Sequence, residues 1–177
     1  MRAFLLCLLL SSLCTSVRAQ VTEQYVQALQ EVDNDNERYG ILYDLTGHLL
    51  EQSGKANRDL AIQYSKELIT VAKRIGRKDF IAPAAYTLGL AYRNNRDERL
   101  ADQFFAETTT LAMQTKDANL IVLAVAERTR LAAKNQNYRE ATRINQEALD
   151  FFTKNGDNNI ASLRAKLEAE KARLRKL

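Results

Sequence analysis

An alanine recurs at one fixed interval along this chain, and a glutamate follows each copy six positions later. The three pairs are Ala61 and Glu67, Ala101 and Glu107, and Ala141 and Glu147. A fixed period of roughly 20 to 50 residues is typical of solenoids, in which each unit buries its apolar face only by stacking on its neighbours. The sequence therefore predicts a stack of repeated units that presents an extended surface.

The composition indicates that each unit is helical. Proline occurs once and glycine six times, so few residues resist a helical backbone. Asn, Asp and Gly gather between the apolar stretches, where Asx side chains cap the following helix and Gly ends the preceding one. These signals predict an all-α chain with helices at about 22–32, 37–52, 57–75, 80–94, 97–114, 118–134, 137–154 and 159–176.

Alignment of the three units predicts which residues are packed. The repeated alanine is expected where two helices of a hairpin cross, because a larger side chain would push their backbones apart. Large apolar residues three and ten positions later would extend the same buried stripe. The nine predicted core residues are Ala61, Ala101, Ala141, Tyr64, Phe104, Ile144, Val71, Leu111 and Phe151.

These units resemble the tetratricopeptide repeats. In the middle unit, the residues on the signature spacing of that family are Leu88, Gly89, Tyr92, Ala101, Phe105 and Thr108. In the third unit, the turn between the two helices is similar to that of the family at Tyr138, Glu140 and Ala141. The first unit keeps Asn57 and Ala61 but has His48 and Leu49 where Leu and Gly would stand.

The resemblance covers about residues 37–156, in units of 37–76, 77–116 and 117–156. It implies a right-handed α-solenoid of about three TPR-like helix-turn-helix repeats. Each unit is longer than the roughly 34 residues that are usual for the family. In this respect the units are similar to the extended variants found in bacterial sensor and regulator proteins.

The resemblance also implies a binding groove, lined by the first helix of each hairpin. The residues expected to project into it are Tyr43, Thr46, Leu50, Tyr86, Leu90, Arg93, Asn94, Glu127, Arg130 and Lys134. Aromatic rings beside Arg and Lys suit an extended peptide or a carboxylate. The alternative is a solvated helix face that binds nothing in particular.

Residues 1–19 have the features of a secretory signal. A positive start is followed by an apolar run from Ala3 to Leu13, and cleavage is expected after Ala19. The apolar run is too short for a spanning helix, which needs roughly 20 residues. A lipoprotein is disfavoured because leucine precedes both Cys7 and Cys14. We expect a periplasmic or secreted protein without stable membrane insertion after cleavage.

Processing would remove both cysteines and lower the formal net charge from +4 to +2. Residues 160–177 alone carry a balance of +4, and residues 157–177 are expected to form a basic amphipathic helix that caps the last hairpin. Residues 20–36 are expected to supply a short N-terminal helix and a turn. A dimerising coiled coil is the alternative for the C-terminal helix, although we favour a monomer. Because the charge is local and the protein is expected to be exported, no nucleic-acid partner is predicted.

The sequence predicts no catalytic, cofactor-binding or metal site. His48 is the only histidine, and without a second histidine or a cysteine in the mature chain it is expected to be structural. Residues 33–37 begin like a calcium loop, but Arg38 stands where that loop needs glycine. An interhelical turn is the preferred reading.

We therefore expect a non-enzymatic, exported scaffold that binds a protein or peptide. The alternative is that the chain is the extracytoplasmic sensory portion of a bacterial signal-transduction protein. Neither hypothesis identifies the partner.

Overall fold

The computed structural model describes residues 20–155, 165, 168–169 and 173, and all regular structure among these residues is α-helical. A helix at 20–31 precedes α2 (Asp35–Leu50), α3 (Lys55–Ile75), α4 (Lys78–Asn94), α5 (Glu98–Thr115), α6 (Ala118–Lys134) and α7 (Tyr138–Asn155). These bounds confirm the all-α prediction and agree with the predicted bounds to within two residues. The predicted signal peptide, and almost all of the helix predicted at 159–176, lie outside the described residues.

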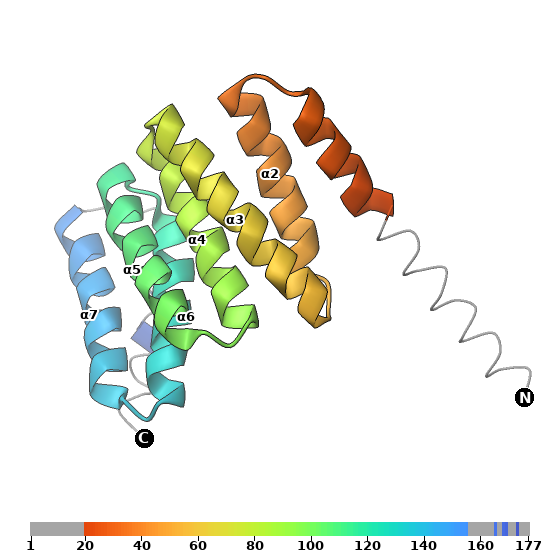
Figure 1. Cartoon of the computed structure of the whole chain (residues 1–177). Coiled ribbons are helices and arrows are strands. Elements are labelled where there is room, and N and C mark those ends of the chain that lie inside the picture. The colour runs from red at the N-terminus through yellow and green to blue at the C-terminus, as the bar shows by residue number, and fades with distance from the viewer. Residues whose placement is uncertain (1–19, 156–164, 166–167, 170–172, 174–177) are drawn as a thin grey trace, which may run out of the picture.

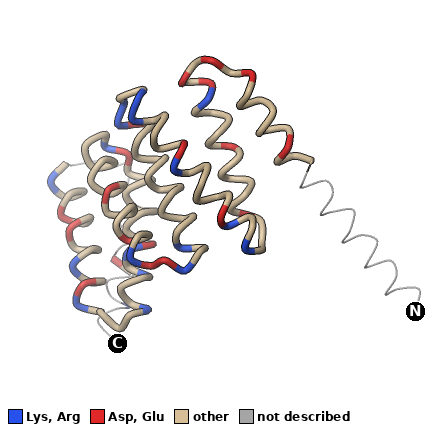
Figure 2. Tube along the Cα trace, in the orientation of Figure 1, with Lys and Arg blue, Asp and Glu red and all other residues tan. Residues whose placement is uncertain are grey.

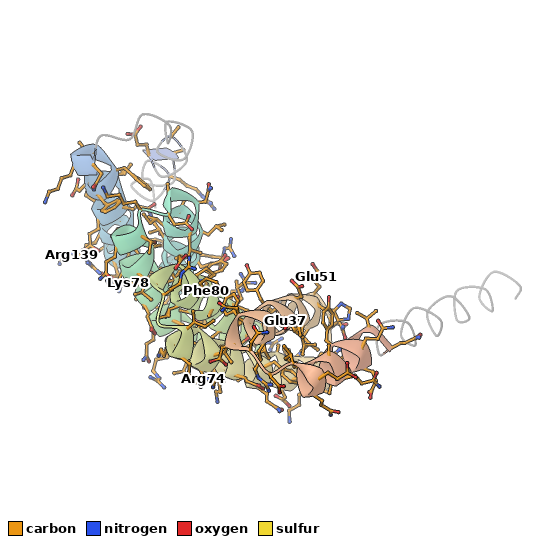
Figure 3. The ribbon with its side chains drawn as sticks, turned by 90° about the horizontal axis from the view of Figure 1, so that it is seen from above. Glu37, Glu51, Arg74, Lys78, Phe80 and Arg139 are labelled. Carbon is orange, nitrogen blue, oxygen red and sulfur yellow. The ribbon has the colours of Figure 1, made fainter. Side chains whose placement is uncertain are left out.

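The helices form antiparallel pairs that stack along one direction (Figure 1). Each helix from α2 to α7 contacts the next in sequence, and α2 also contacts α4, which contacts α6. These contacts are more extensive than any that join α3 to α5 or α5 to α7. Seen from above, the stack follows an arc (Figure 3). The layer formed by α2, α4 and α6 lies on the inner side of this bend, because its helices are in closer contact.

The turns from α3 onward repeat one geometry at an even spacing. A single residue with left-handed backbone stands in each, with φ values of 76°, 66°, 58° and 58° at Gly76, Arg96, Lys116 and Gln136. After the last three of these, the next backbone N–H donates to the carbonyl five residues earlier, from Asp97 to Tyr92, Asp117 to Ala112 and Asn137 to Ala132. This is the Schellman ending of a helix.

The residue that follows each of these last three left-handed positions is also the N-cap of the next helix. The side chains of Asp97, Asp117 and Asn137 accept hydrogen bonds from the backbone N–H three residues later, at 3.1, 3.0 and 3.2 Å. Asn34 does the same for α2, accepting from the N–H of Glu37 at 2.8 Å. The expected interhelical turn lies at residues 32–34, and Asp35 begins α2. An Asp or Asn side chain thus caps the start of each of these helices.

The repeated alanines are core residues, as predicted. Ala61, Ala101 and Ala141 are all buried. The middle hairpin shows a close approach, since a Cβ added to Gly89 would lie 2.6 Å from the ring of Phe105. Phe105 is itself fully buried. Glycine at this position lets the α4 backbone sit directly against an aromatic ring of α5.

The predicted apolar stripe needs a partial correction. Ile144 and Val71 are buried, but Tyr64, Phe104, Leu111 and Phe151 are half-buried. The deepest positions lie one residue later, at Ser65, Phe105 and Asn145, and again at Ala72, Ala112 and Phe152. Successive helical residues are rotated by about 100° about the helix axis. The residue four positions after the alanine therefore points more directly into the hairpin than the residue three positions after it.

Candidate binding face

The ten predicted groove residues all belong to the inner layer. Tyr43, Thr46 and Leu50 lie on α2; Tyr86, Leu90, Arg93 and Asn94 lie on α4; Glu127, Arg130 and Lys134 lie on α6. We call the subset formed by Tyr43, Tyr86, Arg93, Asn94, Glu127 and Arg130 the inner face.

A chain of hydrogen bonds crosses the inner face from α2 to α6. The Asn94 side chain donates through Nδ2 to the carbonyl of Leu50 at 3.2 Å and accepts from Nη2 of Arg93 at 3.1 Å. Nη1 of Arg93 donates to Oε1 of Glu127 at 2.7 Å. Nη1 of Arg130 donates to the other oxygen of Glu127 at 3.0 Å. Three helices that are distant in sequence are thereby linked through side chains.

Glu127 is the centre of this network. Its side chain is only 9% exposed, and two guanidinium groups face its carboxylate. A buried carboxylate is tolerated when paired charges and hydrogen bonds replace its lost water. Two arginines against one carboxylate leave a formal surplus of one positive charge. The side chain of Arg130 is 65% exposed, so this surplus is accessible to solvent.

An aromatic group stands at the α2 end of the inner face. Tyr43 is 45% exposed, and its ring stacks on that of Tyr39 at 6.0 Å between centroids. Tyr39 is fixed in turn, because its hydroxyl donates to the carbonyl of Phe80 at 3.1 Å and its ring meets the Phe80 ring edge-on. Burial raises the pKa of Tyr39. Tyr43 therefore offers an exposed ring on a fixed support.

Tyr86 connects the aromatic end to the charged end. Burial raises its pKa, and the negative charge of Glu127 adds to this effect, while the positive charges of Arg93 and Arg130 oppose it. Tyr43 also acts on the same hydroxyl. Tyr86 therefore lies within electrostatic range of both the charged and the aromatic residues of the inner face.

Three predicted residues lie apart from this network. Thr46 is fully buried, and its hydroxyl donates to the carbonyl of Tyr43 at 2.9 Å within the same helix. Leu90 is half-buried against the apolar core. Lys134 forms an ion pair with Glu98 of α5. The structure therefore brings Lys134 to the junction with α5, which belongs with α3 and α7 to the outer layer of the stack.

The sequence reasoning missed an apolar member of this layer. Leu123 on α6 is 50% exposed, one turn before Glu127. It stands two repeats after Tyr43, and Pro83 occupies the position midway. Extending the repeat alignment from Tyr43 would have found both residues, since the repeat places an apolar side chain at this position in every unit.

Other features of the described residues bear on chemistry. Lys, Arg, Asp and Glu are interspersed over the described helices (Figure 2). No group of three or more His, Cys, Asp or Glu side chains in this part of the chain could hold a metal ion. Within the same residues, no helix is both long enough and apolar enough to cross a bilayer. His48 is half-buried, with its ring 6.3 Å from that of Tyr25.

Two pockets lie elsewhere on the stack. One of about 290 Å³ is formed where α5, α6 and α7 meet, and one of about 260 Å³ lies between Lys116, Ala118 and the end of α7. Neither is lined by any of the ten predicted groove residues. These two pockets are therefore separate from the inner face.

Comparison with known proteins supplies no further constraint. The sequence matches no family model, and no curated protein matches it at a significant level. Inference about function therefore rests on the geometry of the inner face and on the repeat pattern.

Proposed function

We propose that this protein is an exported, non-enzymatic interaction scaffold with a TPR-like, right-handed α-solenoid fold, whose inner face binds an extended peptide segment of a protein partner. The antiparallel helix pairs, the even spacing of the turns and the bend of the stack support this architecture. The apolar run that precedes Ala19 supports export.

The observation that carries the proposal is the arrangement of Arg93 and Arg130 around Glu127. Both guanidinium groups are held by hydrogen bonds before any ligand arrives, so binding loses less side-chain entropy than it would with free arginines. Guanidinium groups recognise carboxylates with two parallel hydrogen bonds. The ligand is accordingly a peptide that carries an acidic side chain or a terminal carboxylate.

The aromatic and aliphatic groups set the second requirement. Tyr43 and Leu123 are exposed at the two ends of the layer, on α2 and α6. A peptide laid across the three helices could bury an apolar side chain against either group while its carboxylate meets Arg130. Aromatic side chains and arginine are enriched at the centres of protein interfaces.

Selection from a random peptide library on the purified protein tests this proposal. We expect the selected peptides to be enriched in Asp, Glu or a free C-terminus near an apolar residue. Their binding should weaken at least tenfold in Arg130→Ala, and it should weaken as salt rises because the charges are exposed. Arg139→Ala, which removes an exposed arginine of α7, is the matched control and should bind normally. Equal enrichment on both variants would reject the inner face as the site.

A further inference from the structure

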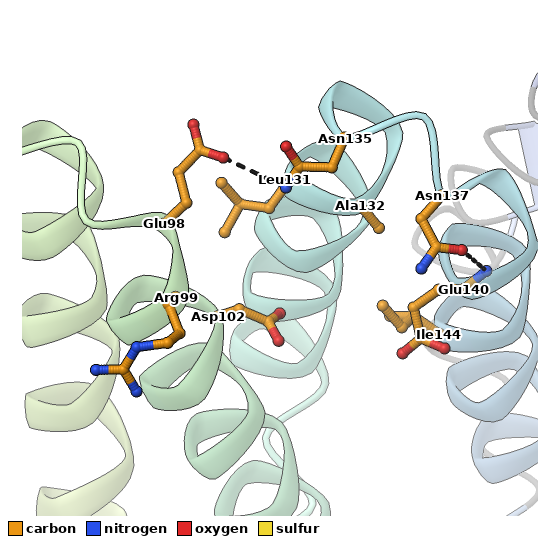
Figure 4. A pocket seen from close by; sticks show the side chains of 9 residues that line it. All are labelled: Glu98, Arg99, Asp102, Leu131, Ala132, Asn135, Asn137, Glu140 and Ile144. Atoms are coloured by element: carbon orange, nitrogen blue, oxygen red, sulfur yellow. Dashed lines mark hydrogen bonds between the residues drawn. The ribbon is translucent and has the colours of Figure 1, made fainter.

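The large apolar side chains that remain exposed lie on the inner layer and not in the larger pocket. Leu131 and Ile144, which line that pocket together with Ala132, are already buried (Figure 4). On the inner layer, in contrast, Tyr43 of α2 is 45% exposed and Leu123 of α6 is 50% exposed. Apolar surface that a ligand can still cover is therefore found on α2 and α6.

These two exposed residues occupy one position of the repeat. Leu123 stands two repeats after Tyr43, and the half-buried Pro83 of α4 stands midway between them. We call these three residues the apolar row. Apolar residues scattered singly over a surface are ordinary, but the apolar row recurs with the period of the fold. A surface position that repeats in this way suits a ligand that runs along the stack.

The apolar row crosses the three helices of the inner layer. α2 contacts α4, and α4 contacts α6, and packed helices lie roughly 8–10 Å apart. Two such steps separate Tyr43 from Leu123 by roughly 16–20 Å. An extended chain rises about 3.3 Å per residue, and its side chains alternate between two sides. Two ligand side chains about six residues apart would therefore span the row and point to the same side, whereas a spacing of about five would place them on opposite sides.

The two ends of the apolar row differ in charge. Asp44 is exposed beside Tyr43 at the α2 end. At the α6 end, the guanidinium of Arg130 reaches back to Glu127, which lies between Arg130 and Leu123 along the helix. The two arginines that bind this carboxylate leave one positive charge in excess there. An acidic group of the ligand is therefore favoured near Leu123 and disfavoured near Tyr43.

We propose that the apolar row and Arg130 together select an extended segment of a partner protein that has two large apolar side chains about six residues apart. One apolar side chain packs on Tyr43 and the other on Leu123, and an acidic side chain close to the second binds Arg130. This requirement rests on the proposed function and adds the spacing and the charged end of the ligand. Residues 156–177 contain no two large apolar residues six positions apart, so that segment of this chain does not meet the requirement.

Fluorescence anisotropy with the full chain and synthetic peptides tests the spacing. Each probe is a labelled, capped peptide of glycine and serine that carries two leucines and, two residues beyond the second leucine, one glutamate. We expect saturable binding that is at least about tenfold tighter at a spacing of six than at a spacing of five, because the odd spacing leaves one leucine uncovered. Equal binding at both spacings, or no binding at either, would overturn the proposal.

Substitutions at the two ends of the apolar row test which leucine meets which residue. Leu123→Ser and Tyr43→Ser should each weaken binding of the peptide with a spacing of six by about tenfold or more. A peptide that lacks the leucine far from the glutamate should respond to Leu123→Ser but not to Tyr43→Ser. Gln103→Ser, at an exposed position of α5, is the matched control and should bind normally. An equal response of the single-leucine peptide to both substitutions would contradict the assignment of the two ends.

The outcomes also separate the spacing requirement from the proposed function. If library-selected peptides depend on Arg130 but show no preference for two apolar residues six apart, the spacing is wrong and the proposed function stands. If neither the selected nor the synthetic peptides depend on Arg130, both fail. A dimer in analytical ultracentrifugation that becomes a monomer in Leu123→Ser would assign the apolar row to a second copy of this chain, and it would likewise overturn the proposal.

Discussion

The side chain of Asn145 on α7 donates a hydrogen bond through Nδ2 to Oγ1 of Thr129 on α6 at 2.7 Å, and both residues are buried. In the preceding hairpin, the same two positions are occupied by Phe105 and Gly89, which are in direct contact. The same contact between the two helices of a hairpin is therefore formed in two ways. The ring of Phe105 packs against the backbone of Gly89 in one hairpin, and the amide of Asn145 binds the hydroxyl of Thr129 in the next.

Gly89→Ala should destabilise the fold, although alanine is the better helix former. The added Cβ would lie 2.6 Å from the Phe105 ring. Overpacking costs about 1–3 kcal/mol, whereas the gain in helix propensity is about 1 kcal/mol. Chemical denaturation should show a net loss of up to about 2 kcal/mol. Gly47→Ala on α2, where a Cβ meets nothing within 4 Å, should instead stabilise, and a gain at both positions would mean that Phe105 yields freely.

Loss of the amide at Asn145 should be costly. Asn145→Ala removes a buried hydrogen bond and leaves the Thr129 hydroxyl without that donor, at a cost of about 1–3 kcal/mol. A double-mutant cycle with Thr129→Ala should give a coupling energy of about 0.5–1.5 kcal/mol. Strictly additive losses in urea denaturation would show that the two side chains do not stabilise one another.

Because Lys116 has a left-handed backbone, replacing it with glycine should stabilise the fold, whereas glycine inside a helix destabilises it. A non-glycine residue in this conformation costs about 1–2 kcal/mol, while glycine loses about 0.5–1 kcal/mol of extra chain entropy. Lys116→Gly should thus stabilise by about 0.5–1 kcal/mol. Gln63→Gly, at an exposed position in the interior of α3, should destabilise by about 1 kcal/mol. Thermal unfolding of both variants compares the two positions, and a loss at Lys116 would refute the argument from its backbone.

Acid should weaken the pair formed by Glu140 and Arg143. The hydrogen bond from Arg143 lowers the pKa of Glu140 below its ordinary value of 4.5. A carboxyl group whose pKa is depressed by folding stabilises the protein above its unfolded pKa, and this contribution is lost as pH falls through the folded pKa. Urea midpoints should consequently fall below about pH 4.5. Glu140→Gln and Arg143→Ala should each flatten that dependence, and the double variant should flatten it little further if the pair is responsible.

The helix bounds could be predicted because apolar periodicity and Asx or Gly signals coincide at the ends of the helices. The turns were expected where the structure has them, but the left-handed backbone at Arg96, Lys116 and Gln136 was not, since none of these residues is glycine. The packed stripe was placed partly one residue early because the alignment fixed spacing but not rotation about the helix axis. The same limit explains Thr46, which the family resemblance assigned to the groove and which the structure buries.

The polar network depended on long-range geometry. Arg93, Glu127 and Arg130 were chosen from their helix positions, but nothing in the sequence indicates that one carboxylate would bind both arginines. The pocket where α5, α6 and α7 meet was also not foreseen.

The same left-handed turn recurs at an even spacing from Gly76 to Gln136, and this spacing affects how such a chain can change in length. Removing one whole repeat between two left-handed positions, for example 97–136, would join Arg96 directly to Asn137 and recreate the same helix ending and the same capping residue. Removing only half a repeat, for example 97–116, would also preserve the turn, but every later helix would exchange the inner layer for the outer one. Side chains selected for binding would then face the opposite side of the arc. The turn geometry is preserved by both deletions. Only the deletion of a whole hairpin, however, keeps each later helix in its own layer, so we expect such chains to gain or lose hairpins and not single helices.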